Sequence, residues 1–463
     1  RAPRLVRPSP TPRMAEPVFS DRATTFSQRR RTTTGHFVLL FDVTLSLFFL
    51  SACAIDIPDT ALSVSTFISP YAGYTQDWQT CAMVYDPRNQ QSYWSVHHHF
   101  LKRANAEDAP FKLLFGHPAA EDESYSWGAT HLGGYNAHDF KQSYERQMTS
   151  PVSRYDFHTE FQFQLGGSAN DEIIVAMDKG LFVVSADPAD PKLLKTVPIA
   201  GRHYNWVANL DTAASYSLTA VNFPDSVVAF LLTPSNNVIY AALTNAKVYR
   251  FADDLRTYWA FTPGSVSADT NRGTPVTKLA RKIGNVKVLG MLPDESVMCA
   301  LESYWSSINI ICIDMATGMT TLTWGVGSTS PESTCTADCD PTTESLTTAA
   351  SMVMGRDQAS GHGFIMVLDL YTIKRLDLST NRYKVILGTL NSYNWDTEAN
   401  LQDKSNVPAL DFLFPDSWSG APRIAGVTAT TLYLASGVDG DRWTVYNVTG
   451  LPTMELLAPP SGT

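Results

Sequence analysis

The chain has 463 residues, of which 44% are apolar and 17% are charged, so it can bury a large core and is neither disordered nor a coiled coil. Residues 1–54 hold eight arginines against three acidic residues, which leaves 27 basic and 42 acidic residues, a net charge of −15, in the remainder. A charge of that sign repels a phosphate backbone, so the composition argues against nucleic-acid binding.

The N-terminal segment 1–54 has the layout of an export signal. Residues 1–35 are polar and basic, and residues 36–54 hold an apolar run from Phe37 to Leu50 that ends on small residues at Ala54. A basic region, a short apolar region and a small-residue cleavage site are the three parts of a secretory signal peptide. The run of about 14 residues is short for a membrane span. We therefore predict a secreted or extracytoplasmic protein.

Two other readings of this region stay open. Cys53 also fits a lipoprotein box, in which it would carry a lipid, and an uncleaved signal anchor is the third alternative; these are the only membrane attachments predicted. Met14 is the first methionine, so residues 1–13 are read as lying upstream of the native start. In an exported chain the sequon at Asn447 is a predicted glycosylation site, usable where the host glycosylates secreted chains.

Beyond the signal region the chain repeats. Short segments rich in β-branched and aromatic residues end in glycine at regular intervals. Gly201, Gly264 and Gly327 are equally spaced along the chain, and the same interval separates Gly325 from Gly388. Equal intervals of this length, about 63 residues, are typical of architectures built from one repeated supersecondary unit.

Each repeat reads as four strands. The clearest unit has apolar runs at 227–232, 238–243, 248–251 and 257–262, joined by turn residues and without a helical period between them. We predict an all-β fold over residues 55–463, a six-bladed β-propeller of four-stranded antiparallel blades. A further N-terminal strand at 62–68 is predicted to pair with the last blade and close the ring. The six units lie near 81–116, 153–201, 226–264, 285–327, 350–388 and 423–458.

The motifs around the glycines resemble those of NHL-repeat propellers. The resemblance is carried by Trp324-Gly-Val-Gly327 leading to Ala349-Ala350, and by Ala200-Gly201 leading to Phe223-Pro224. It implies the propeller fold over roughly residues 60–460. It leaves the activity open, because such propellers bind proteins, RNA, glycans or small molecules and a few are enzymes.

Five cysteines follow the signal region. Cys335 and Cys339 lie in one polar loop and are predicted to form a local disulfide. Cys299 and Cys312 fall on consecutive strands, where a cross-strand disulfide and two buried thiols are equally compatible with the pattern. The odd number leaves one thiol unpaired, which we assign to Cys81.

Two metal sites are alternatives to a metal-free protein. Eight of the nine histidines after the signal region lie between His97 and His203, where converging imidazoles could bind Zn²⁺. Calcium-dependent lactonases and strictosidine synthase-like enzymes are similar six-bladed propellers with an axial metal held by oxygen ligands. That similarity implies a Ca²⁺ site here with four candidate ligands, Asn222, Asp225, Asn285 and Asp416. Asp225 and Asp416 occupy equivalent turns in two units and therefore also fit a structural role.

An insertion at 117–153 separates the first two units, and aromatic residues are spread through its polar sequence. Tyrosine and tryptophan give large contact areas at low entropic cost, and long loops on rigid scaffolds commonly carry function. The alternative is that the rings pack back onto the first two units. The candidate binding residues are Tyr125, Trp127, Tyr135, Phe140 and Tyr144.

These observations predict an exported, non-catalytic binding scaffold without a cofactor, whose ligand is a protein or a glycan. The alternative is a metal-dependent propeller enzyme, either a lactonase or esterase-like hydrolase or a lyase. Polar groups converging on the axis would favour the enzyme, whereas an axis filled by apolar side chains would favour the scaffold.

Overall fold

The structure is a computed structural model, and it describes residues 62–68, 80–96, 99–104, 112–116, 163–166, 172–177, 180–186, 194–200, 227–234, 239–243, 247–251, 258–260, 285–304, 307–317, 320–325, 335, 338–349, 351–389, 393–394, 399, 402–415, 422–439 and 442–459. Within these ranges no helix is long and apolar enough to cross a membrane.

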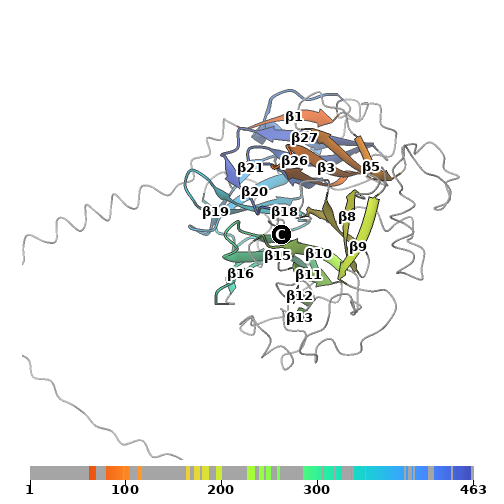
Figure 1. The fold of residues 1–463 in the computed structure, drawn as a ribbon. Coiled ribbons are helices and arrows are strands. Elements are labelled where there is room, and N and C mark those ends of the chain that lie inside the picture. The colour runs from red at the N-terminus through yellow and green to blue at the C-terminus, as the bar shows by residue number, and fades with distance from the viewer. Residues whose placement is uncertain are drawn as a thin grey trace, which may run out of the picture. The chain divides into compact units, whose positions relative to one another are not determined.

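The described part of the chain is all-β, as predicted, and its strands form antiparallel sheets in chain order (Figure 1). Sheet 1 contains β2 (Thr80–Asp86), β3 (Gln91–Val96), β4 (His99–Ala104) and β5 (Lys112–Gly116). Sheet 2 contains β6 (Phe163–Leu165), β7 (Ile173–Met177), β8 (Gly180–Ala186) and β9 (Leu194–Ala200). Sheet 3 contains β10 (Val227–Leu232), β11 (Ile239–Leu243), β12 (Lys247–Phe251) and β13 (Tyr258–Ala260).

Sheet 4 contains β14 (Asn285–Met291), β15 (Val297–Tyr304), β16 (Ser307–Asp314) and β17 (Thr320–Trp324). Sheet 5 contains β18 (Ser351–Asp357), β19 (Gly363–Asp369), β20 (Thr372–Asp377), β21 (Arg382–Leu387) and β28 (Met454–Glu455). Sheet 6 contains β25 (Arg423–Val427), β26 (Leu432–Asp439), β27 (Arg442–Thr449), β1 (Ser63–Ile68) and β23 (Val407–Pro408). A short parallel pair, β22 (Tyr393–Asn394) with β24 (Phe414–Pro415), and the 3-10 helix η3 (Ala409–Asp411) precede sheet 6.

The six sheets occupy the six predicted repeat units, and each sheet contacts the next one along the chain. Strand β2 contacts β6, β7 contacts β10, β10 contacts β14, and β14 contacts β18. Strand β18 in turn contacts β25, and β25 contacts β2 of the first sheet. All of these are first strands except β7, which is the second strand of sheet 2. The contacts between sheets therefore run from sheet 1 to sheet 6 and from sheet 6 back to sheet 1.

The predicted N-terminal strand pairs with the last sheet. Strand β1 lies antiparallel to β27, with Val64 opposite Val448, and β23 pairs with the other edge of β1. Sheet 6 takes only β25 to β27 from its own repeat, so β1 supplies its fourth strand. The edge of β27 is thereby covered by a segment from the opposite end of the sequence.

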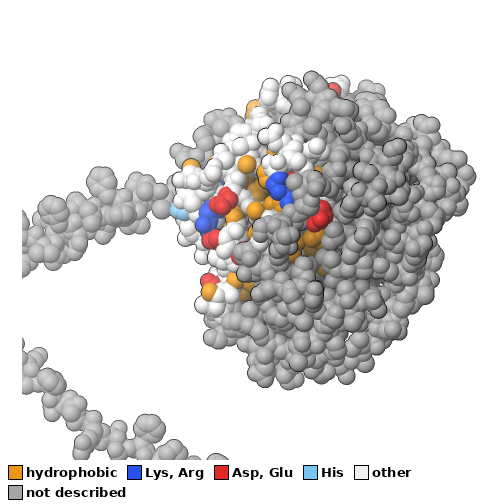
Figure 2. Space-filling view, in the orientation of Figure 1, with side chains coloured by type: hydrophobic (Ala, Val, Ile, Leu, Met, Phe, Trp, Pro, Cys, Tyr) orange, Lys and Arg blue, Asp and Glu red, His pale blue; other side chains and the backbone are white. Residues whose placement is uncertain are grey.

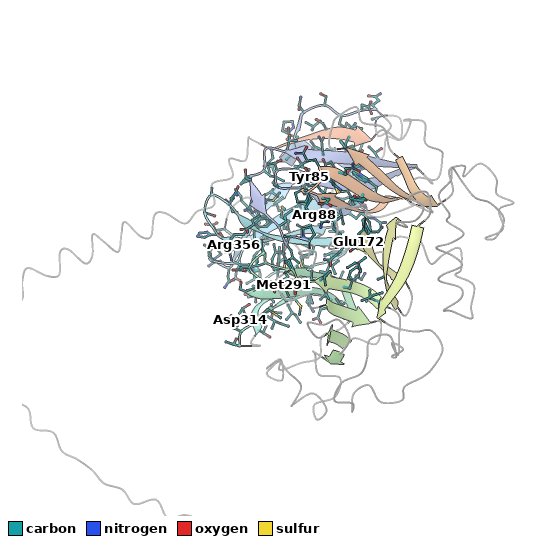
Figure 3. All side chains as sticks on the ribbon, in the orientation of Figure 1. Tyr85, Arg88, Glu172, Met291, Asp314 and Arg356 are labelled. Atoms are coloured by element: carbon teal, nitrogen blue, oxygen red, sulfur yellow. A yellow bond between two sulfur atoms is a disulfide. The ribbon has the colours of Figure 1, made fainter. Side chains whose placement is uncertain are left out.

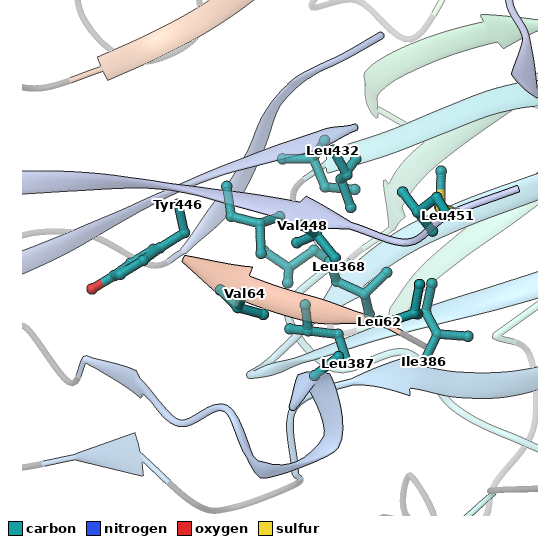
Figure 4. Packing of buried hydrophobic residues seen from close by; sticks show 14 of the residues in the cluster. Leu62, Val64, Leu368, Ile386, Leu387, Leu432, Tyr446, Val448 and Leu451 are labelled. Atoms are coloured by element: carbon teal, nitrogen blue, oxygen red, sulfur yellow. The ribbon is translucent and has the colours of Figure 1, made fainter. Parts of the chain in front are cut away.

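Successive sheets pack face to face, and this explains their nearly continuous apolar strands. In β26, Leu432 and Leu434 pack with sheet 5, whereas Tyr433 and Ala435 pack with sheet 1. In β19, Phe364 packs in the core towards sheet 6, whereas Ile365 and Val367 pack in the core towards sheet 4. Side chains alternate between the two faces of a strand, so a strand buried on both faces must be apolar at every position. Figure 4 shows the core between sheets 5 and 6.

Two of the regularly spaced glycines, Gly325 and Gly388, have a common backbone role. Gly325 follows β17 and Gly388 follows β21, with φ values of 92° and 80°. L-residues rarely adopt this left-handed conformation, so glycine is the residue that fits both strand ends. The interval between these two glycines therefore reflects the same turn at the end of two successive sheets.

Candidate functional site

The turns at one end of sheets 4 and 5 bring together a set of polar side chains. In an antiparallel sheet, the turn between the first two strands and the turn between the last two lie at the same end. The Arg356 guanidinium on β18 donates to the Asp294 carboxylate in the β14–β15 turn, which joins these ends of the two sheets. We call this set the turn cluster: Asp294, Asp314, Arg356, Asp357, His362, Arg375, Asp377 and Ser379.

Figures 2 and 3 show this region. Acidic and basic side chains lie beside one another on the visible face, with apolar side chains between them. Arg356 and Asp314 are labelled on neighbouring sheets.

Several carboxylates of the turn cluster stabilise the turns in which they lie by accepting hydrogen bonds. The Asp314 carboxylate accepts hydrogen bonds from the Thr317 amide at 2.7 Å and the Thr317 hydroxyl at 2.8 Å, and these bonds lower its pKa below the usual value. Burial alone would raise the pKa of Asp294, but hydrogen bonds from Ser296 and the charge of Arg356 lower it. Asp377 accepts from Ser379 and also from the Thr380 amide at 3.3 Å. In sequence Asp314-Met-Ala-Thr317 corresponds to Asp377-Leu-Ser-Thr380, and in both turns the aspartate accepts from the amide of the threonine three residues on.

Ser379, His362 and Asp377 contact one another but are not arranged as a catalytic triad. Both Ser379 Oγ and Asp377 Oδ2 lie near His362 Nδ1, at 3.2 and 3.3 Å. A triad requires the serine at Nε2 and the carboxylate at Nδ1, so that the ring relays a proton between them. Here the serine hydroxyl donates directly to Asp377 Oδ1 at 2.6 Å, which makes it a turn-stabilising group.

Arg375 occupies the buried side of the turn cluster. Its guanidinium lies 4.4 Å from the centre of the Phe364 ring, and Nη2 is 3.4 Å from Asp357 Oδ2. Burial lowers the pKa of Arg375, partly offset by the Asp357 and Asp377 carboxylates. These contacts join the ends of β18 and β20 within sheet 5.

A second buried ionic group anchors the segment that leads into sheet 5. Lys374 Nζ on β20 donates to Glu344 Oε1 at 2.5 Å and to Asp369 Oδ2 at 2.8 Å, and all three side chains are buried. Asp369 Oδ1 also accepts from the amides of Thr347 and Thr348. With its ammonium group enclosed between two carboxylates, Lys374 has the contacts of a structural residue.

The first-strand edge of sheet 5 carries the C-terminal segment 451–459, which we call the tail. Glu455 and Met454 pair with Arg356 and Asp357 of β18, so the tail adds a strand to the first-strand edge of sheet 5. Leu456 packs on the core of sheets 5 and 6, and Leu457 packs on the core of sheets 3 and 4. The tail therefore places apolar side chains against four of the six sheets.

Most candidate binding residues from the sequence fall outside the described residues. This holds for Tyr125, Trp127, Tyr135, Phe140 and Tyr144, for Asn222, Asp225 and Asp416, and for most of the histidine-rich segment. Asn285 begins β14 opposite Ser303, with its side chain not described. Among the described residues, no group of three or more His, Cys, Asp and Glu side chains is placed to hold a metal ion. The Ca²⁺ and Zn²⁺ sites remain predictions.

The cysteine pairs are joined. A disulfide links Cys335 to Cys339, and another links Cys299 to Cys312, which are directly opposite in the β15–β16 ladder. Cys335 is buried because Trp324 and Tyr383 belong to the same core cluster, although its own loop is polar. The Cys339 and Tyr383 backbones also exchange hydrogen bonds, so this segment covers the outer edge of β21. Two disulfides fit an extracytoplasmic protein.

The glycosylation sequon lies within the last sheet. Asn447 is on β27, opposite Ser65 of β1 and Tyr433 of β26, and is half-buried. Its use as a glycan acceptor stays a prediction.

Sequence reasoning does not find the tail or the two buried ionic groups. The signal for the tail is Met454-Glu455-Leu456-Leu457, an apolar group placed after the last repeat strand. Glu344 lies 30 residues before Lys374, and Asp357 lies 18 residues before Arg375, so both pairings depend on how sheet 5 and the segment before it fold.

No protein-family model and no curated protein matches the chain. Among solved structures it is similar to an auxiliary nutrient binding protein from Bacteroides ovatus, with 12% identity over 84% of this chain and 77% of that chain and a TM-score of 0.47. A putative phosphatase from Bacteroides thetaiotaomicron gives 9% identity, 85% and 79% coverage and a TM-score of 0.46. A luciferin-regenerating enzyme gives 11% identity, 87% and 100% coverage and a TM-score of 0.42. Similarities at this level assign neither a family nor a function.

Proposed function

We propose that the protein is an exported, non-catalytic binding scaffold built as a six-bladed, NHL-like β-propeller, and that its ligand is a protein or a glycan. The propeller is supported by the regular repeat of the sequence and by the contacts between neighbouring sheets, which run from β2 of sheet 1 to β25 of sheet 6 and back to β2. The pairing of β1 with β27 supports closure of the ring through the last blade.

The apolar tail carries the functional proposal. Met454 is buried between sheets 5 and 6, and Leu456 and Leu457 lie against the cores of neighbouring sheets. An axial metal enzyme needs an open, polar centre where several oxygen or nitrogen ligands converge. The methionine and leucine side chains along the first-strand edge of sheet 5 supply no such ligands, which favours the binding scaffold.

Ligand recognition is assigned to the insertion at 117–153. The carboxylates of the turn cluster already accept hydrogen bonds from their own turns or pair with arginine, so their charge is largely satisfied within the protein. The insertion combines five aromatic residues with polar neighbours, a composition typical of recognition surfaces. Export is supported by the signal-like sequence and the two disulfides.

The experiment compares two secreted full-chain variants on an array of immobilised glycans and a panel of purified extracellular proteins. One replaces all five insertion aromatics by serine. The matched control replaces five charged residues of the same insertion by alanine: Glu121, Asp122, Glu123, Asp139 and Lys141. The aromatic variant should lose the ligand bound by the wild-type chain, whereas the control should keep it, with equal melting temperatures.

Enzyme assays test the alternative, a metal-dependent enzyme. The wild-type chain is incubated with lactone, ester and amidated-peptide substrates in EDTA, millimolar Ca²⁺ or micromolar Zn²⁺, and its thermal unfolding is followed in the same buffers. Metal-dependent turnover with a metal-specific rise in melting temperature would replace the scaffold with the metal-enzyme alternative.

A further inference from the structure

The tail is bound to β18 in the manner of an added strand. Besides the pairing of Glu455 with Arg356, the Gln358 amide donates to the Thr453 carbonyl at 2.9 Å. The Met454 amide donates to the Ala429 carbonyl of the β25–β26 turn at 2.6 Å. Main-chain bonds to a sheet edge are how many domains bind extended peptides, because such bonds do not depend on the peptide's side chains.

The edge of β18 is shaped for a close backbone approach. A Cβ atom added at Gly355 would stand 2.8 Å from Phe364 Cζ within sheet 5, 2.9 Å from the Glu455 carbonyl oxygen and 3.1 Å from Leu456 Cδ2. A side chain at this position would therefore displace the Phe364 ring and the backbone of the tail. Glycine inside a strand commonly marks such an approach by another backbone.

Side chains of the tail enter two different cores. Met454 is 3% exposed and belongs to the core of sheets 5 and 6, where Leu456 packs as well. Leu457 packs on the core that contains Leu231 of β10 and Met291 of β14. The surface that binds the tail, which we call the seat, thus selects apolar side chains at three of four successive positions.

The remaining position favours an acidic residue. Glu455 is exposed and lies directly opposite Arg356 in the antiparallel register, beside the guanidinium that also donates to Asp294. Opposite charges at directly facing positions stabilise a strand pair. The pattern that matches the seat is therefore apolar, acidic, apolar, apolar.

The tail is a separable element. Sheet 6 has its full set of strands through β1, and sheet 5 has four strands of its own without β28. The tail follows the last long strand, so its departure would interrupt no connection between sheets.

We propose that the seat formed by β18, the β25–β26 turn and the cores of sheets 3 and 4 is a peptide-binding groove. Its ligand is an extended peptide with the pattern apolar-acidic-apolar-apolar, and the tail is its resident ligand in cis. This site is independent of the insertion at 117–153.

Covalent attachment of the tail explains why the groove is occupied in the intact chain. A segment attached by a short linker has an effective concentration in the millimolar range. A free peptide at micromolar concentration competes poorly with it. Only a chain whose tail has been removed or loosened should bind the peptide.

The test is fluorescence anisotropy with a labelled peptide of the tail sequence, Leu451 to Thr463. A chain ending at Gly450 should bind it with a micromolar Kd, and the full chain should bind at least tenfold more weakly. A peptide carrying Leu456→Asp and Leu457→Asp should not bind. A Glu455→Lys peptide should bind several-fold more weakly, with the difference shrinking at high salt.

Matched glycine variants of the shortened chain test the location. Gly355→Ala should lose the peptide, whereas Gly361→Ala should keep it, because a Cβ atom at Gly361 meets nothing within 4 Å. The Cβ atom at Gly355 also meets Phe364, so the melting temperatures of the two variants are compared, and the loss counts only where the Gly355→Ala chain is as stable as the Gly361→Ala chain. Serine replacements of the insertion aromatics should leave peptide binding unchanged, which separates failure of this site from failure of the proposed scaffold function.

A shortened chain that folds but does not bind the peptide would overturn the proposal. If the shortened chain does not fold, the full chain with Leu456→Asp and Leu457→Asp takes its place and should bind the wild-type peptide. Absence of binding there, or failure of both chains to fold, would make the tail an integral part of the core and would equally overturn the groove.

Discussion

Gly388 lies against the Tyr371 carbonyl so closely that an added Cβ atom would stand 2.1 Å from that oxygen. The strand end therefore depends on glycine for two reasons, the left-handed backbone and the lack of space. Gly361 shares the first reason, with φ of 73°, but has open space around it.

These two glycines separate conformational strain from steric conflict. Gly361→Ala should cost about 1 kcal/mol of unfolding free energy, the usual penalty for a left-handed alanine. Gly388→Ala should cost about 3 kcal/mol or more, because the clash adds to the same penalty. Urea unfolding of both variants measures the difference, and equal losses would show that the Tyr371 contact relaxes freely.

The buried lysine gives a second contrast. Lys374→Met would leave the Glu344 and Asp369 carboxylates without their cation, and removing one partner of a buried ion group costs about 3–5 kcal/mol. Arg382→Met removes an exposed cation 4.0 Å from Asp340 and should change the unfolding free energy by less than about 0.5 kcal/mol. A similar melting temperature for the two variants would contradict the anchoring role of Lys374.

The two disulfides should differ in their resistance to reduction. Cys299 and Cys312 are both fully buried, whereas Cys339 is only partly buried. Under native conditions a phosphine reductant should therefore open Cys335–Cys339 first. Alkylation at timed intervals followed by peptide mass spectrometry gives the order, and earlier labelling of Cys299 or Cys312 would count against the stacked core.

The Asp314 turn predicts a pH-dependent effect. Because its folded pKa lies below the usual value of 3.8, Asp314 contributes stability above that pH, and the contribution is lost as the pH falls through the folded pKa. Thr317→Val removes the hydroxyl bond and should raise this pKa. The variant should be less stable than the wild type at pH 7, with a smaller gap near pH 3. A gap that is constant with pH would mean that Thr317 acts through packing alone.

Much of the fold follows from local sequence pattern. The regular glycine spacing predicts where the sheets lie, and the turn residues predict the strand ends, because period and turn chemistry act over a few residues. Pairing of β1 with the last sheet is also predictable, since an additional strand before the first unit can cover the exposed edge of the last one.

Local pattern is thus sufficient for the all-β class, for the positions of the repeats and for the strand that completes the last sheet. Three contacts emerge only in three dimensions: Lys374 with Glu344, Arg356 with Asp294, and the tail with β18. Strand formation depends on neighbours along the chain, whereas these contacts depend on how the sheets, the segment before sheet 5 and the tail pack together. The partner of such a residue is set by the packing of whole elements, which no local pattern encodes.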